Sequence, residues 1–377
     1  MPDYHARLVR IKAKLPLARE ADPQLKVFGA NGHKYHTAGP VPENHLRTLE
    51  QQYGIELPAD YRQFLREIGP GAGPFYGLYA PGSHLGMLDT TPAVALPRPS
   101  PLRPRLSAAE WTVLTQPFED DDMSDADYQL ETDRLFAGIW PLGTQGCSYY
   151  HGLLLHGEHR GRVVNLDVER GQPKFAYEAN FLDWYERWLD EVINGTLLRD
   201  GPSWFGYQRG GTEAELLAGY RAAPNPTEQE EYLIGLARLP AASTATAQVL
   251  AAACASTYPA VARQALAMLT KFDYQQARPR LKSLWPGDSL LVYKLLNWYA
   301  KPYAEEWVAE LQATFALPDP HQELFSFATY VAQECTTDLS AAIQPWLKHP
   351  KLGAQAEYTL REIAGKRRLW ERVRPGK

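Results

Sequence analysis

The sequence has few cysteines, no excess of positive charge and no long hydrophobic run. Its three cysteines, Cys147, Cys254 and Cys335, are widely spaced and odd in number, which argues against a disulfide framework and for a reducing compartment. A net charge of −5 gives no reason to expect a nucleic acid partner, because such proteins present a basic face. The run VLAAACA is too short to span a bilayer, and the N-terminus lacks the apolar core of a signal peptide. We therefore expect a soluble cytoplasmic protein that binds neither membrane nor nucleic acid.

Sequence signatures of catalysis are also missing. The chain contains no G-x-S-x-G, H-E-x-x-H or G-x-x-x-x-G-K-[ST] motif. Four potential zinc ligands, Cys147, His151, His156 and His159, lie within 13 residues, but an odd separation along a strand would point His151 and His156 to opposite faces. An enzyme that uses Cys147 as nucleophile and a nearby histidine as base is a further alternative. We predict no catalytic residue, no metal and no cofactor.

The chain is long enough for more than one core, and its first part mixes helix and strand signals. A length of 377 residues predicts two or three domains. Apolar spacing predicts helices over 45–53 and 58–68, followed by a glycine-rich turn and a strand at PFYGLY. The glycines at 69, 71, 73 and 77 follow a helix, whereas a phosphate loop follows a strand, so we predict a structural turn.

Later segments of this part predict a hairpin and a closing helix. Residues 152–157 and 161–167 are β-rich and bounded by glycine, with 158–160 as the exposed connection. Residues 181–193 place their apolar positions on one stripe, with Asp183, Glu186 and Asp190 away from it. This pattern is typical of an amphipathic surface helix.

Three stretches resemble the SUKH superfamily. They are LEQQYGIELPADYRQFLREIGPGAGPFYGLY, IWPLGTQGCSYYHGLLLHGEHRGRVVNLD and FLDWYERWLDEVINGTL, and they occur in the family's order over about residues 40–198. The resemblance implies an α+β domain with a mixed or antiparallel sheet and flanking helices. Family members include fungal regulators of cell-wall synthesis and many bacterial immunity proteins, which commonly neutralise a cognate toxin by capping it.

The second half of the sequence reads as a helical repeat. Predicted helices begin near Pro226, Tyr258, Asp288, His321 and Lys351, at intervals of 30 to 33 residues. Second helices begin between them, near Thr244, Tyr274, Tyr303 and Asp338. A helix pair that recurs at this spacing indicates an α-solenoid, in which neighbouring pairs stack into one core. The units resemble short HEAT-type repeats.

The sharpest local feature is the acidic stretch EDDDMSDAD, in which six of nine residues are acidic. It can be a solvated loop, an electrostatic docking patch for a basic protein, or a divalent-metal loop. The metal alternative lacks the glycine and the distal glutamate of an EF-hand. The candidate partner-binding residues are Glu119, Asp120, Asp121, Asp122, Asp125 and Asp127.

These observations predict a binding protein that is not an enzyme. The expected organisation is a helical extension (1–39), a SUKH-like α+β domain (40–198), a linker (199–223) and an all-α repeat domain (224–377). The leading hypothesis is a bacterial immunity protein whose partner is a toxin with a basic surface. The alternative is a regulatory scaffold without a toxin partner. The sequence does not fix an oligomeric state.

Overall fold

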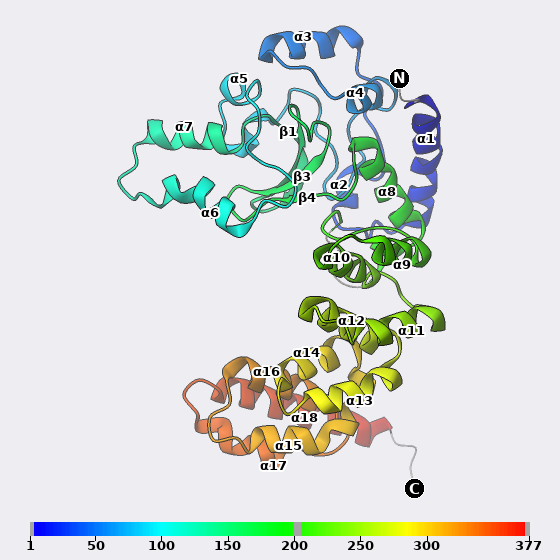
Figure 1. Cartoon of the computed structure of the whole chain (residues 1–377), viewed down its shortest axis with the longest axis vertical. Coiled ribbons are helices and arrows are strands. Elements are labelled where there is room, and N and C mark those ends of the chain that lie inside the picture. The colour runs from blue at the N-terminus through cyan, green and yellow to red at the C-terminus, as the bar shows by residue number, and fades with distance from the viewer. Residues whose placement is uncertain (1–3, 200–204, 374–377) are drawn as a thin grey trace. The chain divides into compact units, whose positions relative to one another are not determined.

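The computed structural model describes residues 4–199 and 205–373, and within 367–373 it describes the backbone alone. The chain divides into two compact units, Met1–Gly210 and Gly211–Lys377 (Figure 1). The first unit is an α+β domain and the second is made of helices, which confirms the predicted fold class.

The first unit is built on an antiparallel sheet with strand order β1-β2-β3-β4. The hairpin expected over 152–157 and 161–167 forms, but its first strand, β2, runs three residues earlier, from Tyr149 to Leu154, and contains Gly152. Strands β2 and β3 pair from Tyr149↔Asp167 to Leu153↔Val163. The elements of this unit, in chain order, are α1 (Tyr4–Ala21), α2 (Ala30–His33), α3 (Glu43–Tyr53), α4 (Ala59–Glu67), η1 (Leu85–Leu88), α5 (Pro92–Ala95), α6 (Ala108–Thr115), η2 (Gln116–Glu119), α7 (Asp125–Leu135), β1 (Ile139–Gly146), β2 (Tyr149–Leu154), β3 (Val163–Asp167), β4 (Lys174–Phe175), α8 (Phe181–Ile193) and η3 (Thr196–Leu198).

Both faces of the sheet are buried, each in its own hydrophobic cluster. Alternate residues of a strand point to opposite faces, so Leu153 and Val163 pack in the cluster that contains α4 and α8. Leu154 and Val164 pack in a second cluster with residues of α6 and α7. Figure 1 shows α6 and α7 on the other side of the sheet from α8.

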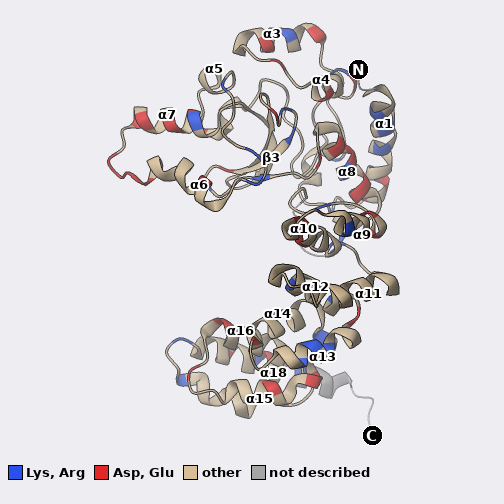
Figure 2. Ribbon diagram, in the orientation of Figure 1, with Lys and Arg blue, Asp and Glu red and all other residues tan. Residues whose placement is uncertain are grey.

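Helix α8 is not the surface helix that the sequence predicted. Nine of its 13 residues are buried, including Glu186. Helix α1 covers the acidic stripe of α8: Arg7 pairs with Asp183, and Arg10 Nε and Lys14 Nζ each lie 2.9 Å from Glu186 Oε1 (Figure 2). Burial alone would raise the pKa of Glu186, but hydrogen bonds from Arg10 and Lys14 lower it. Periodicity within α8 could not reveal a covering helix about 175 residues away.

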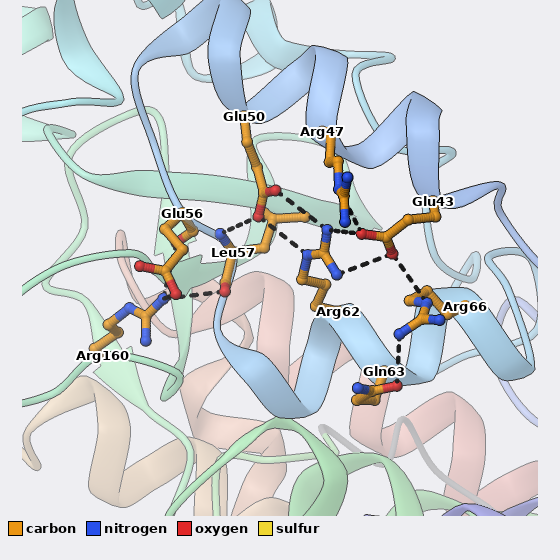
Figure 3. A network of polar contacts seen from close by, with 9 residues as sticks. All are labelled: Glu43, Arg47, Glu50, Glu56, Leu57, Arg62, Gln63, Arg66 and Arg160. Carbon is orange, nitrogen blue, oxygen red and sulfur yellow. Dashed lines mark hydrogen bonds and ion pairs between the residues drawn. The ribbon is translucent and has the colours of Figure 1, made fainter.

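A network of charged side chains joins α3 to α4 (Figure 3). Arg62 of α4 donates to both Glu43 and Glu50 of α3, and its Nη2 lies 2.7 Å from Glu43 Oε1. The hydrogen bond from Arg62 is the main cause that lowers the pKa of Glu43 to about 2. Glu50 also accepts from the backbone N–H of Leu57, so the turn between the two helices is bound to the same network.

The glycine-rich segment after α4 is a structural turn, and PFYGLY is not a strand. The N–H groups of Gly69, Gly71 and Ala72 donate to the carbonyl oxygens of Phe64, Leu78 and His36, so they are not free to hold a phosphate. Single bridges join Gly71 to Thr37 and to Leu78. The left-handed backbone of Gly71 and Gly77 interrupts any extended strand here.

The second unit consists of stacked helix pairs. Helices α10, α12, α14 and α16 begin at Pro226, Pro259, Ser289 and Gln322, each within one residue of its predicted start. The elements are α9 (Glu213–Ala222), α10 (Pro226–Leu236), α11 (Thr244–Ala253), α12 (Pro259–Phe272), α13 (Tyr274–Leu284), α14 (Ser289–Tyr299), η4 (Lys301–Trp307), α15 (Val308–Phe315), α16 (Gln322–Ala332), α17 (Ser340–Ile343), η5 (Gln344–Lys348) and α18 (Gly353–Val373).

Helix α9 lies in the segment that the sequence suggested as a linker. Thr212 caps it, accepting from the N–H of Glu215 while the Glu215 carboxylate accepts from the N–H of Thr212. This T-x-x-E pattern is a capping box and could have been recognised.

Charged side chains tie successive helix pairs of the second unit together. Lys271 of α12 donates to the carbonyl oxygen of Leu239, just beyond the end of α10, and Lys366 of α18 donates to that of Gln333 at the end of α16. Glu213 accepts from the N–H of Ser243, and Glu305 accepts from the N–H of Thr336. The partners are 30 to 33 residues apart, which is the spacing of one repeat.

Substitution of Gly69 by alanine tests the turn. Gly69 has φ +92°, and a Cβ there would lie 1.8 Å from the carbonyl oxygen of Gly39. We expect Gly69→Ala to cost about 3 kcal/mol or more of unfolding free energy, because the clash is with backbone that cannot move aside. Gly54→Ala is the matched control: its φ is +62°, nothing lies within 4 Å of the added Cβ, and the left-handed backbone alone costs about 1 kcal/mol. Urea unfolding of the two full-length variants measures both losses, and equal losses would contradict the close approach.

Candidate functional site

The six candidate acidic residues lie at the connection between η2 and α7, called here the acidic connection (Glu119–Asp127). Glu119 ends η2, and Asp125 and Asp127 begin α7, so the stretch is partly helical and not a loop throughout. All six side chains are exposed, and none forms an ion pair with a described residue. Figure 2 shows the connection as a run of acidic residues at the end of the α6–α7 pair. Its role as a binding site stays a prediction.

Local hydrogen bonds order the acidic connection. Asp120 Oδ1 accepts from the N–H of Asp122 at 3.0 Å, which closes a turn. Ser124 caps α7: its Oγ accepts from the N–H of Asp127 and donates to Asp127 Oδ2. Acidic residues at a helix N-terminus are also stabilised by the helix dipole. The carboxylates of Asp120 and Asp127 are therefore held by local hydrogen bonds, and no described cation neutralises them.

Aromatic and cationic contacts fix the acidic connection against the turn after β3. Phe118 packs edge-on against Tyr128, with ring centroids 5.6 Å apart. Arg170 lies over the Phe118 ring at 4.6 Å and donates to the Tyr128 hydroxyl at 3.2 Å. The Trp111 indole N–H donates to the backbone oxygen of Arg170. These contacts make the α6–α7 pair a supported projection of the domain.

Helix α6, which precedes the acidic connection, was not predicted from the sequence. Ser107 and Glu110 form a capping box at its start, and the S-x-x-E pattern was available in the sequence. Helix α6 lacks the repeated apolar spacing of a buried helix, so its apolar periodicity did not predict it. Only Trp111 of its eight residues is buried.

The structure separates the cysteine and the histidines that the sequence placed in one cluster. Cys147 is exposed in the turn between β1 and β2, whereas His151 is fully buried in β2. His156 Nε2 lies 2.8 Å from the backbone oxygen of Leu96, and His159 packs against Phe175. No hydrogen bond joins Cys147 to a described histidine, and no three of the described His, Cys, Asp and Glu side chains are placed to hold a metal ion.

His151 is a core residue with an unusual environment. Its ring lies between Phe75 and Trp184, with centroids 6.0 Å and 5.3 Å away, and both ring nitrogens lack a hydrogen-bond partner among the described residues. Burial lowers the pKa of His151 to about 3. The backbone of Gly143 approaches closely, since a Cβ there would lie 2.7 Å from His151 Nε2. The histidine is held neutral inside the protein and is not exposed for catalysis.

Buried histidines predict a loss of stability in acid. Burial lowers the pKa of His33 to about 4 and that of His151 to about 3, below the usual 6.5. As the pH falls, these histidines therefore bind protons in the unfolded chain before they do so in the folded protein. Their contribution to the free energy of unfolding is complete above pH 6.5, and it is lost as the pH falls toward 4 for His33 and toward 3 for His151. Each group contributes a slope of about 1.4 kcal/mol per pH unit in this window.

The variant His151→Leu isolates the contribution of His151. Between pH 6 and 4 we expect its unfolding free energy to fall less steeply than that of the wild type, by about 1.4 kcal/mol per pH unit. His45→Leu, at an exposed position of α3, is the control and keeps the wild-type slope. Parallel curves for all three proteins in urea titrations at several pH values would contradict a buried neutral His151.

Comparison with known proteins agrees with the architecture of the first unit. No helix among the described residues is long and apolar enough to cross a membrane. Searches of curated proteins and of solved structures find no match. The region from α3 to the middle of α8, residues 40–187, matches the SMI1 / KNR4 family (SUKH-1), which covers less than half of the chain.

Proposed function

We propose that this protein is a bacterial immunity protein that neutralises a cognate toxin by binding and occluding it in the cytoplasm. The acidic connection is the docking element, and the toxin presents a basic surface. The protein performs no chemistry of its own in this proposal. The match of residues 40–187 to the SMI1 / KNR4 family (SUKH-1) supports a protein-binding role, because bacterial members of the superfamily commonly act as immunity proteins.

The observation that carries the proposal is the exposure of six carboxylates that have no cationic partner among the described residues, on a supported projection. The acidic stripe of α8 offers a contrast within the same domain, because Arg7, Arg10 and Lys14 neutralise it. Unpaired charge of one sign attracts an oppositely charged partner over a distance of about 8 Å at physiological salt and speeds its encounter. The carboxylates of Asp120 and Asp127 are ordered by hydrogen bonds before binding, so these two lose little conformational entropy when the partner binds.

The second unit supports an alternative function as a regulatory scaffold. Stacked helix pairs form extended surfaces that commonly bind other proteins, and we propose that these pairs are HEAT-like. A scaffold would capture several endogenous proteins and protect against no toxin. An immunity protein would form one stable complex and restore growth.

Coexpression tests the immunity proposal directly. The product of the gene adjacent to this one is expressed in a heterologous bacterium, with and without the protein. We expect growth arrest by the neighbouring product alone, restoration of growth by coexpression, and co-purification of the two as a stable complex. Toxicity that persists despite expression of folded protein would overturn the immunity proposal.

Neutralising the acidic connection tests its role in docking. In the triple variant Asp120→Asn, Asp121→Asn and Asp122→Asn, we expect association with the toxin to slow by about tenfold at low salt, because electrostatic steering is lost. The dependence of the association rate on ionic strength should flatten as well. Stopped-flow or surface-plasmon measurements give both quantities. The matched control replaces Asp183 by Asn on the neutralised stripe of α8 and should leave the rate unchanged.

A further inference from the structure

Helix α6 exposes more apolar surface than a helix of a folded domain normally does. Five of its eight residues are apolar, yet only Trp111 is buried. Val113 keeps 67% of its surface exposed, the largest fraction among the large hydrophobic side chains described as exposed. An apolar face left open on one helix is typical of an interaction surface.

A depression of about 430 Å³ runs along this face, and we call it the α6 groove. Its apolar lining combines Pro101 and Leu106, from the segment before α6, with Ala109, Val113 and Leu114 of α6. Arg103 and Glu110 also line the groove and form an ion pair with each other. The groove is therefore apolar along its length, with a single neutralised charge pair.

The segment that carries α6 and the acidic connection is strongly negative. The segment 107–135 contains one basic residue, Arg134, and nine acidic residues: Glu110, Glu119, Asp120, Asp121, Asp122, Asp125, Asp127, Glu131 and Asp133. Arg134 is itself paired with Glu131. A partner that fills the groove must therefore combine apolar side chains with positive charge.

We propose that the α6 groove binds one amphipathic helix of the partner protein, with apolar side chains in the groove and Lys or Arg side chains toward the acidic connection. This inference rests on the proposed function, because it assigns the toxin's contact element. Helix α6 is eight residues, or about 12 Å, long. Its length matches two turns of a bound helix, which would insert anchors at positions i, i+3 or i+4, and i+7.

The charge of the segment argues against a second copy of this chain as the occupant. In a two-fold symmetric dimer each copy would present the same patch to the other. Two segments with nine acidic residues and one basic residue each would then face one another and repel. A small ligand fits less well, because the groove offers no convergent polar groups beyond one ion pair.

A synthetic peptide tests the inference without the toxin. The probe is a fluorescently labelled Leu/Lys peptide of about 18 residues, whose leucines form one face of a helix of about 27 Å. Its control has the same composition but alternates Leu and Lys, so it carries the same charge without an apolar helical face. Anisotropy titrations with the full-length protein at physiological salt should give clearly tighter binding of the helical peptide.

Two groove variants and one matched control locate the site. We expect Val113→Asp and Ala109→Asp to weaken binding of the helical peptide by about tenfold or more, as loss of a central anchor does. Each change adds a carboxylate, which alone would strengthen attraction to a basic peptide, so the loss reports on the apolar contact. Leu317→Asp makes the same kind of change at an exposed position of the second unit, 43% exposed, and should bind as the wild type does.

The outcomes separate this inference from the proposed function. Wild-type affinity in both groove variants, or equal binding of the alternating peptide, overturns the groove as a helix-binding site. Full restoration of growth by Val113→Asp in the coexpression assay overturns the groove as the toxin's contact while the immunity proposal stands. Failure of the wild-type protein to restore growth overturns the immunity proposal. In that case the peptide titrations alone decide whether the α6 groove binds an amphipathic helix.

Discussion

Helix α8 is the element on which the first unit depends. Its aromatic face packs against α4, where the ring centroid of Phe181 lies 4.7 Å from that of Tyr61 and 5.0 Å from that of Phe64. Trp184 meets His151 of the sheet at 5.3 Å. On its polar side, Glu186 forms ion pairs with Arg10 and Lys14 of α1. Helix α4, the sheet and helix α1, which are distant in sequence, thus all pack against α8. The position of the sheet, and with it that of the outer helices α6 and α7, depends on this packing.

The domain uses negative charge in two different ways. On α8 the carboxylates are covered by a basic helix, so they contribute to the cohesion of the fold. At the acidic connection Asp120 accepts a hydrogen bond within its turn and Asp127 accepts one from the helix cap, and no described cation neutralises the carboxylates. Sequence composition alone does not distinguish these two sets, because both appear as clusters of Asp and Glu. Only their surroundings in the folded chain separate a structural charge from one that is available to a partner.

Short sequence patterns predicted those features of the structure that depend on neighbouring residues alone, such as helix starts. The starts of α10 and α12 were predictable because proline at a first helical turn is a strong signal. The strand expected at PFYGLY does not form, since close backbone approaches around Gly71 and Gly77 override its aromatic β-propensity. The burial of α8 depends on α1, and the α6 groove depends on apolar lining supplied by Pro101 and Leu106. The position and exposure of the acidic connection could be predicted, but not the neighbouring groove.

The polar contacts between helix pairs of the second unit have a consequence for its mechanics. Lys271 and Lys366 each donate to the preceding pair, and the main helix contacts in the described residues likewise join near neighbours. Such short-range connectivity costs little loop-closure entropy, which favours rapid assembly from any starting point. It also means that a terminal pair can peel away while the interior stays intact. Under mechanical tension, the helix pairs of the second unit would therefore unfold one after another, beginning at an end.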